Sequence, residues 1–249
     1  MQKVAVIGAR GFLGSALVSA LSPSSEVTPV AVTRENYEEM RKDRYDVLIN
    51  CAMPSARFWA AQHPDMDFIE TVEKTANLLY GWTFKKMIHV STISARCQID
   101  TVYGRHKAAA EKLCDFDGHL IVRFGALYST GITKGVLVDM VQNNTVFVDG
   151  ESRYCFASVE FASNWIASNL HRSGVVEVGG RNAMVLKDIA KYLGSTSTFE
   201  GVIDHQEVQN PEPDFPEASE VLMFLDTWNK QSETTVNLCH PNHLFLRRK

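Results

Sequence analysis

Residues 4–14 read Val4-Ala5-Val6-Ile7-Gly8-Ala9-Arg10-Gly11-Phe12-Leu13-Gly14, and this stretch decides the fold expected of the chain. An apolar run that leads into a turn with three glycines is typical of a buried parallel strand followed directly by a helix. The first glycine permits a tight bend, the second lets a phosphate approach the backbone, and the third lets the helix pack closely on the sheet. The helix N-terminus adds unpaired N–H groups. We therefore predict dinucleotide binding, rather than a mere strand-to-helix turn, by Gly8, Arg10, Gly11, Phe12, Leu13 and Gly14.

Outward from this turn, short β-rich runs alternate with helical stretches. The expected strands are residues 4–7, 27–33, 47–52, 87–90 and 120–124, and the expected helices are residues 12–21, 37–43, 66–82 and 108–113. This alternation predicts an α/β fold, a doubly wound parallel sheet of the Rossmann type.

After about residue 125 the alternation loosens. Helices are expected at residues 136–142, 159–171, 186–193 and near 218–228, with a strand at 175–178. We predict a dinucleotide-binding domain over residues 1–125 and a smaller α/β substrate-binding lobe, packed on it, over residues 126–249.

The composition favours a cytoplasmic protein that acts on small molecules. A net charge of −4 gives no general attraction to nucleic acid or to an anionic membrane. No apolar stretch has the length of a membrane span, and the N-terminus lacks the pattern of a signal peptide. The five cysteines are scattered, without paired spacing, and indicate reduced thiols. Cys239, His240 and His243 are read as a polar tail, so no metal site is expected.

The end of the second expected strand bears on the choice of cofactor. An acidic residue there would accept the ribose hydroxyl of NAD, whereas arginine accommodates the additional phosphate of NADP. The sequence has Thr33-Arg34, and Arg10 stands in the glycine turn. Two guanidinium groups suit a phosphate. NADP(H) is favoured and NAD(H) stays possible, since Arg34 alone is equally typical of a solvated loop.

Tyr103 and Lys107 are four residues apart at the start of a helix, and this spacing places both on one face. A lysine ammonium near a phenol lowers the pKa of the phenol, which favours proton exchange with a carbonyl or alcohol. Ser91-Thr92-Ile93-Ser94 supplies hydroxyl groups at the carboxyl end of a strand, where open α/β sheets bind ligands. His106, next to Lys107, is expected to face solvent, and the segment around Trp59 is expected to be a loop.

Together these motifs resemble the extended short-chain dehydrogenase/reductases, the superfamily of nucleotide-sugar epimerases, dehydratases and reductases. The resemblance is carried by V-I-G-A-R-G-F-L-G-S-A, L-I-N-C-A, H-V-S-T-I-S, Y-G-R-H-K-A-A-A-E-K, I-V-R-F-G-A-L-Y-S, F-A-S-V-E-F-A-S-N-W-I and V-V-E-V-G-G. It implies that Tyr103 is the catalytic acid/base, that Lys107 lowers its pKa and binds the nicotinamide ribose, and that Thr92 is the hydroxyl partner. It further implies cofactor contacts at Cys51 and Ala52, substrate contacts at Ser94, Arg123 and Arg153, and a possible homodimer.

Within the superfamily, the glycine turn and T-R-E-N are similar to GDP-fucose synthase and the dTDP-4-dehydrorhamnose reductases. The resemblance thus implies an NADPH-dependent reductase of a nucleotide-linked keto sugar, with a sugar nucleotide as the small-molecule partner. An epimerase with tightly bound NAD and a non-catalytic NADP(H)-binding protein are the alternatives. A dehydratase is disfavoured because Ile93-Ser94 replaces the usual Asp-Glu pair. The gap between Thr92 and Tyr103 is markedly shorter than in typical members, and the substrate lobe is reduced.

Overall fold

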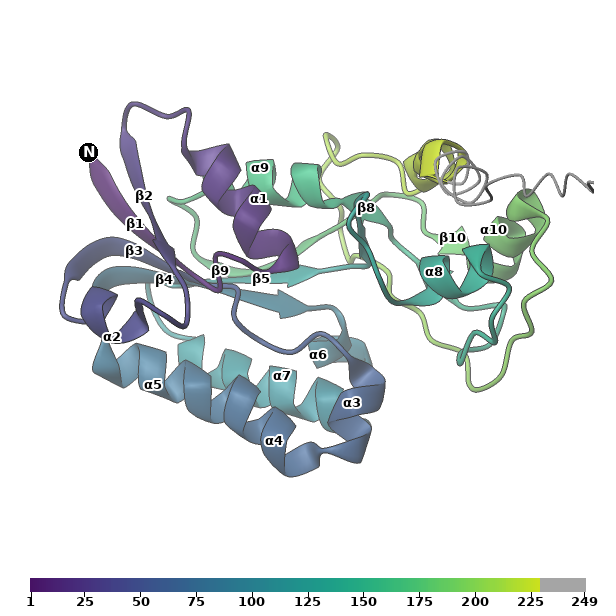
Figure 1. Ribbon diagram of the computed structural model, residues 1–249, viewed down its shortest axis with the longest axis horizontal. Coiled ribbons are helices and arrows are strands. Elements are labelled where there is room, and N and C mark those ends of the chain that lie inside the picture. Colours follow the sequence, from purple (N-terminus) through teal and green to yellow (C-terminus); the bar gives the residue numbers. More distant parts are fainter. Residues whose placement is uncertain (229–249) are drawn as a thin grey trace, which may run out of the picture.

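The computed structural model describes residues 1–228 and contains one six-stranded sheet with helices on both faces (Figure 1). All neighbouring strands are parallel. Their order across the sheet is β2 (Val27–Val32), β1 (Gln2–Ile7), β3 (Arg44–Asn50), β4 (Thr83–Thr92), β5 (Leu120–Phe124) and β9 (Gly174–Val178). From β1 the chain passes to β2, which pairs with one edge of β1, and then to β3, which pairs with the other edge. The winding therefore reverses between β1 and β3, which is where such sheets bind ligands.

Helices cover the sheet in two layers. Figure 1 shows α1 and α9 on one face, and α3, α4, α5 and α7 on the other. The bounds are α1 (Phe12–Leu21), α2 (Tyr37–Met40), α3 (Arg57–Gln62), α4 (Pro64–Phe68), the π-helical turn η1 (Ile69–Glu73), α5 (Lys74–Gly81), α6 (Ser94–Cys97), α7 (Val102–Cys114) and α9 (Val159–Ser168). The expected doubly wound α/β fold is confirmed.

Apolar side chains of the central strands alternate between two cores. Val4, Ile88 and Val122 pack under α1 and α9, whereas Met87 and Ile121 pack with Leu78 of α5 on the opposite face. Strands that are buried on both faces need continuous apolar runs, which is why the sequence pattern identified them.

The division at residue 125 needs correction, because β9 and α9 belong to the main sheet and its covering layer. β9 lies far along the chain from β5 but joins the sheet through hydrogen bonds to it. The second lobe has its own core and consists of β6 (Leu127–Tyr128) with β8 (Ala157–Ser158), β7 (Arg153–Tyr154) with β10 (Met184–Val185), α8 (Val136–Val141), α10 (Leu186–Leu193) and a helix at 220–228.

Other expectations differ in detail. The helix expected at 66–82 is built from α4, η1 and α5, and the loop expected around Trp59 contains α3. The helix expected at 159–171 ends at Ser168. None of the helices in residues 1–228 has the length and apolar character needed to cross a bilayer.

Candidate functional site

The glycine turn lies at the carboxyl end of β1 and has the shape that a phosphate cradle requires. Gly8 has φ +82°, and a Cβ there would lie 3.0 Å from Ala52, two residues after the end of β3. A Cβ on Gly14 would lie 2.2 Å from the Gly8 carbonyl oxygen, so α1 approaches the turn too closely for any side chain. Gly11 is the N-cap of α1 and makes no side-chain cap, which leaves the first N–H groups of the helix for a ligand.

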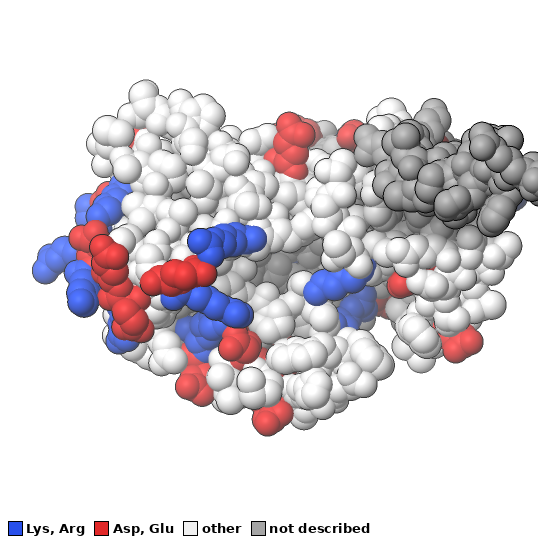
Figure 2. All heavy atoms as spheres, viewed as in Figure 1, with Lys and Arg blue, Asp and Glu red and all other residues white. Residues whose placement is uncertain are grey.

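The two arginines of the cofactor prediction lie at the exposed edge of this turn. Arg10 Nη1 donates to Glu35 Oε1 at 2.6 Å, and both side chains are largely exposed. Arg34 is exposed as well. Figure 2 shows basic and acidic side chains intermixed at the end of the molecule formed by β2 and α2. An anion at this edge would therefore compete with Glu35 for Arg10.

Cys51 and Ala52 follow β3 and line the inner side of the turn. Cys51 packs against the core under α1 and donates its backbone N–H to Ile7. Burial raises the pKa of its thiol to about 12, so the thiol is protonated and acts as a small apolar side chain.

Tyr103, Lys107 and Thr92 come together at the carboxyl end of β4. Thr101 caps α7 by accepting from Gly104 N–H, which fixes the first turn and thereby Tyr103. Tyr103 and Lys107 are only 7% and 3% exposed. Lys107 Nζ lies 5.2 Å from the centre of the Tyr103 ring. The Thr92 hydroxyl is close enough to lower the pKa of the phenol by hydrogen bonding.

The pKa of Tyr103 is raised, not lowered as expected from its neighbour Lys107. Burial raises the pKa of Tyr103 to about 12 and outweighs the nearby Arg57 cation, which lowers it. Burial also lowers the pKa of Lys107 to about 7, so its charge is itself poorly tolerated. The phenol is accordingly a proton donor rather than a phenolate at neutral pH.

The three residues expected to contact substrate all have protein partners. Ser94 is buried and donates to Gln206 Oε1 at 3.3 Å. Arg123 lies under the sheet, where its Nη2 donates to Glu111 Oε2 at 2.7 Å and its Nη1 lies 3.5 Å from Glu177. Odd-numbered residues of β5 point toward α7, so Arg123 lies on that face of the sheet. There it forms an ion pair within the protein. Arg153 is half-exposed and pairs with Glu207 at 2.8 Å.

A polar network that the sequence analysis missed joins the two lobes. Arg57, at the start of α3, donates to Asp204 Oδ2 at 2.5 Å and to the Tyr154 hydroxyl at 2.7 Å. The other Asp204 oxygen accepts from Gln206 Nε2 at 2.8 Å, and Gln206 also meets Ser94. No sequence signal marks either residue, since Gln206 begins a proline- and acid-rich segment, residues 206–216, that is typical of an exposed loop, and Asp204 lies just before it.

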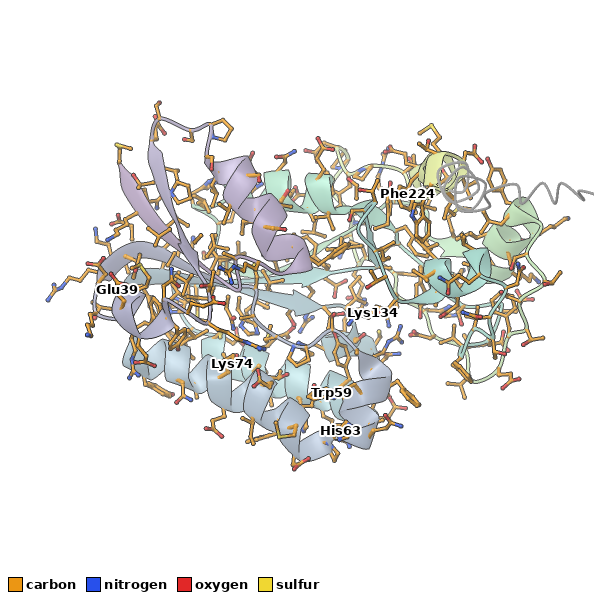
Figure 3. The ribbon with its side chains drawn as sticks, viewed as in Figure 1. Glu39, Trp59, His63, Lys74, Lys134 and Phe224 are labelled. Carbon is orange, nitrogen blue, oxygen red and sulfur yellow. The ribbon has the colours of Figure 1, made fainter. Side chains whose placement is uncertain are left out.

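The Arg57 cation of this network is near enough to Tyr103 to lower the pKa of the phenol. Figure 3 places Trp59 of α3 and Lys134 at the boundary between the lobes, and Figure 2 shows Lys and Arg atoms in the middle of this face.

His106 does not simply face solvent, which corrects the sequence expectation. Its Nδ1 lies 2.7 Å from Oδ2 of Asp67, and its side chain is only 18% exposed. His106 follows Tyr103 by three residues, a spacing that keeps it near the same face of α7.

Within residues 1–228, no group of three or more His, Cys, Asp or Glu side chains is arranged to hold a metal ion. Cys239, His240 and His243 lie outside the described residues.

Comparison with known proteins gives likeness in structure alone. No protein-family model and no curated protein sequence matches the chain. The dTDP-4-dehydrorhamnose reductase of Bacillus anthracis, solved with NADP, has a TM-score of 0.71 and 16% identity and covers 91% of this chain and 99% of its own. RMD of Pseudomonas aeruginosa, solved with NADPH, has a TM-score of 0.71 and 17% identity over 92% and 100%.

A third similar structure is the UDP-glucuronic acid 4-epimerase of Bacillus cereus, in complex with UDP-glucuronic acid and NAD. Its TM-score is 0.65 with 18% identity, over 96% of this chain and 100% of its own. At this level of identity the likeness establishes that the chain has the fold of these enzymes, including the second lobe.

Proposed function

We propose that this chain is an NADPH-dependent reductase that adds a hydride to the carbonyl carbon of a nucleotide-linked keto sugar. One observation carries the proposal. The glycine turn after β1 and the cluster of Thr92, Tyr103 and Lys107 after β4 lie at the same carboxyl edge of one parallel sheet, beside the point where its winding reverses. The NADP and NADPH found in similarly folded proteins support this choice of cofactor.

The residues present fit a dinucleotide. Gly8 and Gly14 leave a cradle that a Cβ would fill, α1 offers its first N–H groups, and the exposed Arg10 and Arg34 at the edge of the turn would bind an additional ribose phosphate. When bound, NADPH supplies the hydride for the carbonyl carbon. Lys107 would hold the nicotinamide ribose.

Side chains of this protein then protonate and bind the substrate oxygen. Tyr103 donates its O–H proton to the oxygen as negative charge develops there, and Thr92 donates a hydrogen bond to the same oxygen. Arg57 and Lys107 provide positive potential beside the phenol. The second lobe, with Lys134 and Arg153 exposed, would bind the phosphates of the sugar nucleotide. A homodimer stays a prediction.

The test is consumption of NADPH, followed by its near-ultraviolet absorbance, with a panel of nucleotide-linked keto sugars. We expect loss of absorbance with at least one member of the panel and one alcohol formed for each NADPH consumed. An epimerase would instead interconvert sugars without net consumption of the cofactor. NADPH that binds but is never consumed, by any member of the panel, would contradict the proposal.

A separate prediction concerns the preference for NADPH over NADH. Replacing both Arg10 and Arg34 with alanine should raise the Kd for NADPH by about tenfold or more, because charge-assisted hydrogen bonds to a phosphate are lost. The Kd for NADH should change little. Glu35→Gln should tighten NADPH binding, because it frees Arg10 from its ion pair. Fluorescence titration measures both constants, with Arg105→Ala, an exposed arginine of α7, as the control.

One observation favours the alternative of a non-catalytic NADP(H)-binding protein. Ser94 is occupied by Gln206, and Arg57 by Asp204 and Tyr154, so the polar groups on the substrate side are already satisfied within the protein. Under this alternative Tyr103→Phe would leave NADPH binding unchanged, and the unchanged protein itself would consume no NADPH.

A further inference from the structure

The ion pair at the boundary between the lobes engages one side of an arginine and leaves another side open. Arg57 donates from Nη1 to Asp204 Oδ2 at 2.5 Å and from Nη2 to the Tyr154 hydroxyl at 2.7 Å, so both partners meet the end of the guanidinium group. The lateral fork of the group, made of Nε and the second N–H of Nη2, has no hydrogen-bond partner among residues 1–228. Such a fork binds a carboxylate through two parallel hydrogen bonds.

Asp204, which orients this arginine, is itself held from several directions. Its side chain is only 4% exposed, and it accepts from the Tyr154 hydroxyl at 2.7 Å and from Gln206 Nε2 at 2.8 Å. Its backbone N–H donates to the buried hydroxyl of Ser152 at 3.0 Å. Several donors share the charge of the carboxylate, so Asp204 fixes Arg57 without cancelling its positive charge. The guanidinium is therefore oriented before any ligand arrives.

Stabilisation of the contact between the lobes does not account for this arrangement. An ion pair taken out of water is often no better than well-packed apolar residues of similar volume. The Arg57 side chain is 35% exposed, so the pair does not close it off from solvent. The Tyr154 ring supports it, with the ring centre 5.9 Å from the guanidinium carbon. A fixed arginine with an accessible fork is suited to bind an anion.

The same network leads to the hydroxyl groups of the candidate site. Gln206 Oε1 accepts from the Ser94 hydroxyl at 3.3 Å, and the Ser94 N–H donates to Thr92 Oγ1 at 3.3 Å. α3, which begins at Arg57, packs on α7, which carries Tyr103. Next to burial, which raises the pKa of Tyr103, the Arg57 cation has the largest effect on this phenol and lowers its pKa. Arg57 thus lies beside the place proposed for the reacting carbonyl.

The chemistry of the anion follows from this position. The phosphates of a sugar nucleotide are expected at Lys134 and Arg153, which are exposed on the second lobe. A negative charge that meets Arg57 would then belong to the sugar itself, close to the carbonyl. A carboxylate is planar and offers two oxygens at the spacing of the fork. The hydroxyl groups of a neutral sugar offer no charge to pair with the cation.

We propose that Arg57 selects a substrate whose sugar carries a carboxylate, so that the protein reduces the keto form of a sugar-acid nucleotide. This assignment rests on the proposed function and names its substrate class. With the carboxylate held in the fork of Arg57, the carbonyl oxygen of the same sugar is positioned at Tyr103 and Thr92.

The experiment compares acidic and neutral sugar nucleotides that differ only in this group. The full-length protein is saturated with NADPH, and the chosen ligands carry no ketone for it to reduce. Calorimetry measures the Kd for UDP-glucuronate and UDP-glucose, dTDP-glucuronate and dTDP-glucose, and GDP-mannuronate and GDP-mannose. We expect at least one acid to bind about tenfold more tightly than its neutral partner, the effect of one hydrogen-bonded charge pair.

Three variants assign this preference to Arg57. Arg57→Gln combined with Asp204→Asn removes both charges, so that no buried carboxylate is left unpaired, and should make the acid and its neutral partner bind equally. Arg57→Lys keeps the charge beside Asp204 but lacks the fork, and should lower the preference severalfold. In both variants the Kd for the neutral partner should stay within about twofold of its original value. Arg105→Gln, at an exposed arginine of α7, is the control and should keep the full preference.

Three results would count against the assignment. Binding of the neutral partner as tightly as the acid, in every pair that the unchanged protein binds, would overturn it. Equal weakening of acid and neutral ligands in the Arg57 variants would also overturn it, because Arg57 would then contact the diphosphate that both share. If NADPH binds but no sugar nucleotide of either kind does, the proposed function itself fails and the assignment fails with it.

Discussion

Tyr103→Phe is expected to reduce carbonyl reduction by roughly 10²–10⁴-fold, the usual contribution of a positioned acid, with the Kd for NADPH unchanged. The phenol is buried beside Thr92 and Lys107, and burial holds its pKa at about 12. The group is therefore protonated throughout the neutral range, which suits it to donate a proton. Phenylalanine keeps the ring and its packing but cannot protonate the substrate oxygen. The measurement is NADPH consumption at saturating cofactor.

Tyr45→Phe provides a matched control for the loss of a buried hydroxyl. Tyr45 is 3% exposed, donates to the Met40 carbonyl at 2.8 Å, and lies near the start of β3, at the opposite edge of the sheet from the site. Its replacement should cost some stability and leave the reduction rate intact. Equal rates for the unchanged protein and Tyr103→Phe would remove Tyr103 from the role of proton donor.

Gly104→Ala is expected to destabilise the fold by about 2–3 kcal/mol, a fall in Tm of about 5–10 °C. Alanine normally stabilises a helix relative to glycine. Here a Cβ would lie 2.0 Å from the Gln98 carbonyl oxygen and 2.9 Å from that of Ser94, both of which are backbone atoms. The start of α7 would have to move away from α6, and Tyr103 would separate from Thr92. We expect activity to fall more than stability alone accounts for.

Gly131→Ala is the control, because a Cβ there would approach nothing closer than Ser129 Oγ at 3.9 Å. Thermal unfolding followed by circular dichroism compares the two variants, and NADPH consumption at a temperature where both are folded reports on the site. A Gly104→Ala protein as stable as Gly131→Ala would show that the α6–α7 contact can relax without cost.

Gly104 also explains how the short gap between Thr92 and Tyr103 keeps the two side chains together. α6 begins two residues after Thr92, and the chain turns at Gln98, whose carbonyl accepts from both the N–H and the hydroxyl of Thr101. Without a side chain at Gly104, α7 begins directly against α6. A long intervening loop is unnecessary.

The sequence by itself determined the sheet and the glycine turn, because their signals are local. A strand buried on both faces must be continuously apolar, as in residues 4–7 and 120–124, and both segments are strands in the structure. Gly14 is required by its contact with the Gly8 carbonyl six residues earlier, Gly8 has a positive φ of its own, and α1 spans residues 12–21 as expected. The order of the motifs along the chain likewise predicted that the fold would resemble that of nucleotide-sugar enzymes.

Only the tertiary structure decided which residues surround those motifs. β9 joins the sheet by pairing with β5, although β6, β7 and β8 of the second lobe lie between them in sequence. Asp204 and Gln206 reach Arg57 and Ser94 across more than a hundred residues, and Asp67 reaches His106 from another helix. For the same reason the pKa of Tyr103 is raised, whereas the sequence predicted that it would be lowered. Spacing along a helix shows which groups are neighbours, whereas burial, which here outweighs the neighbouring charges, depends on everything packed above them.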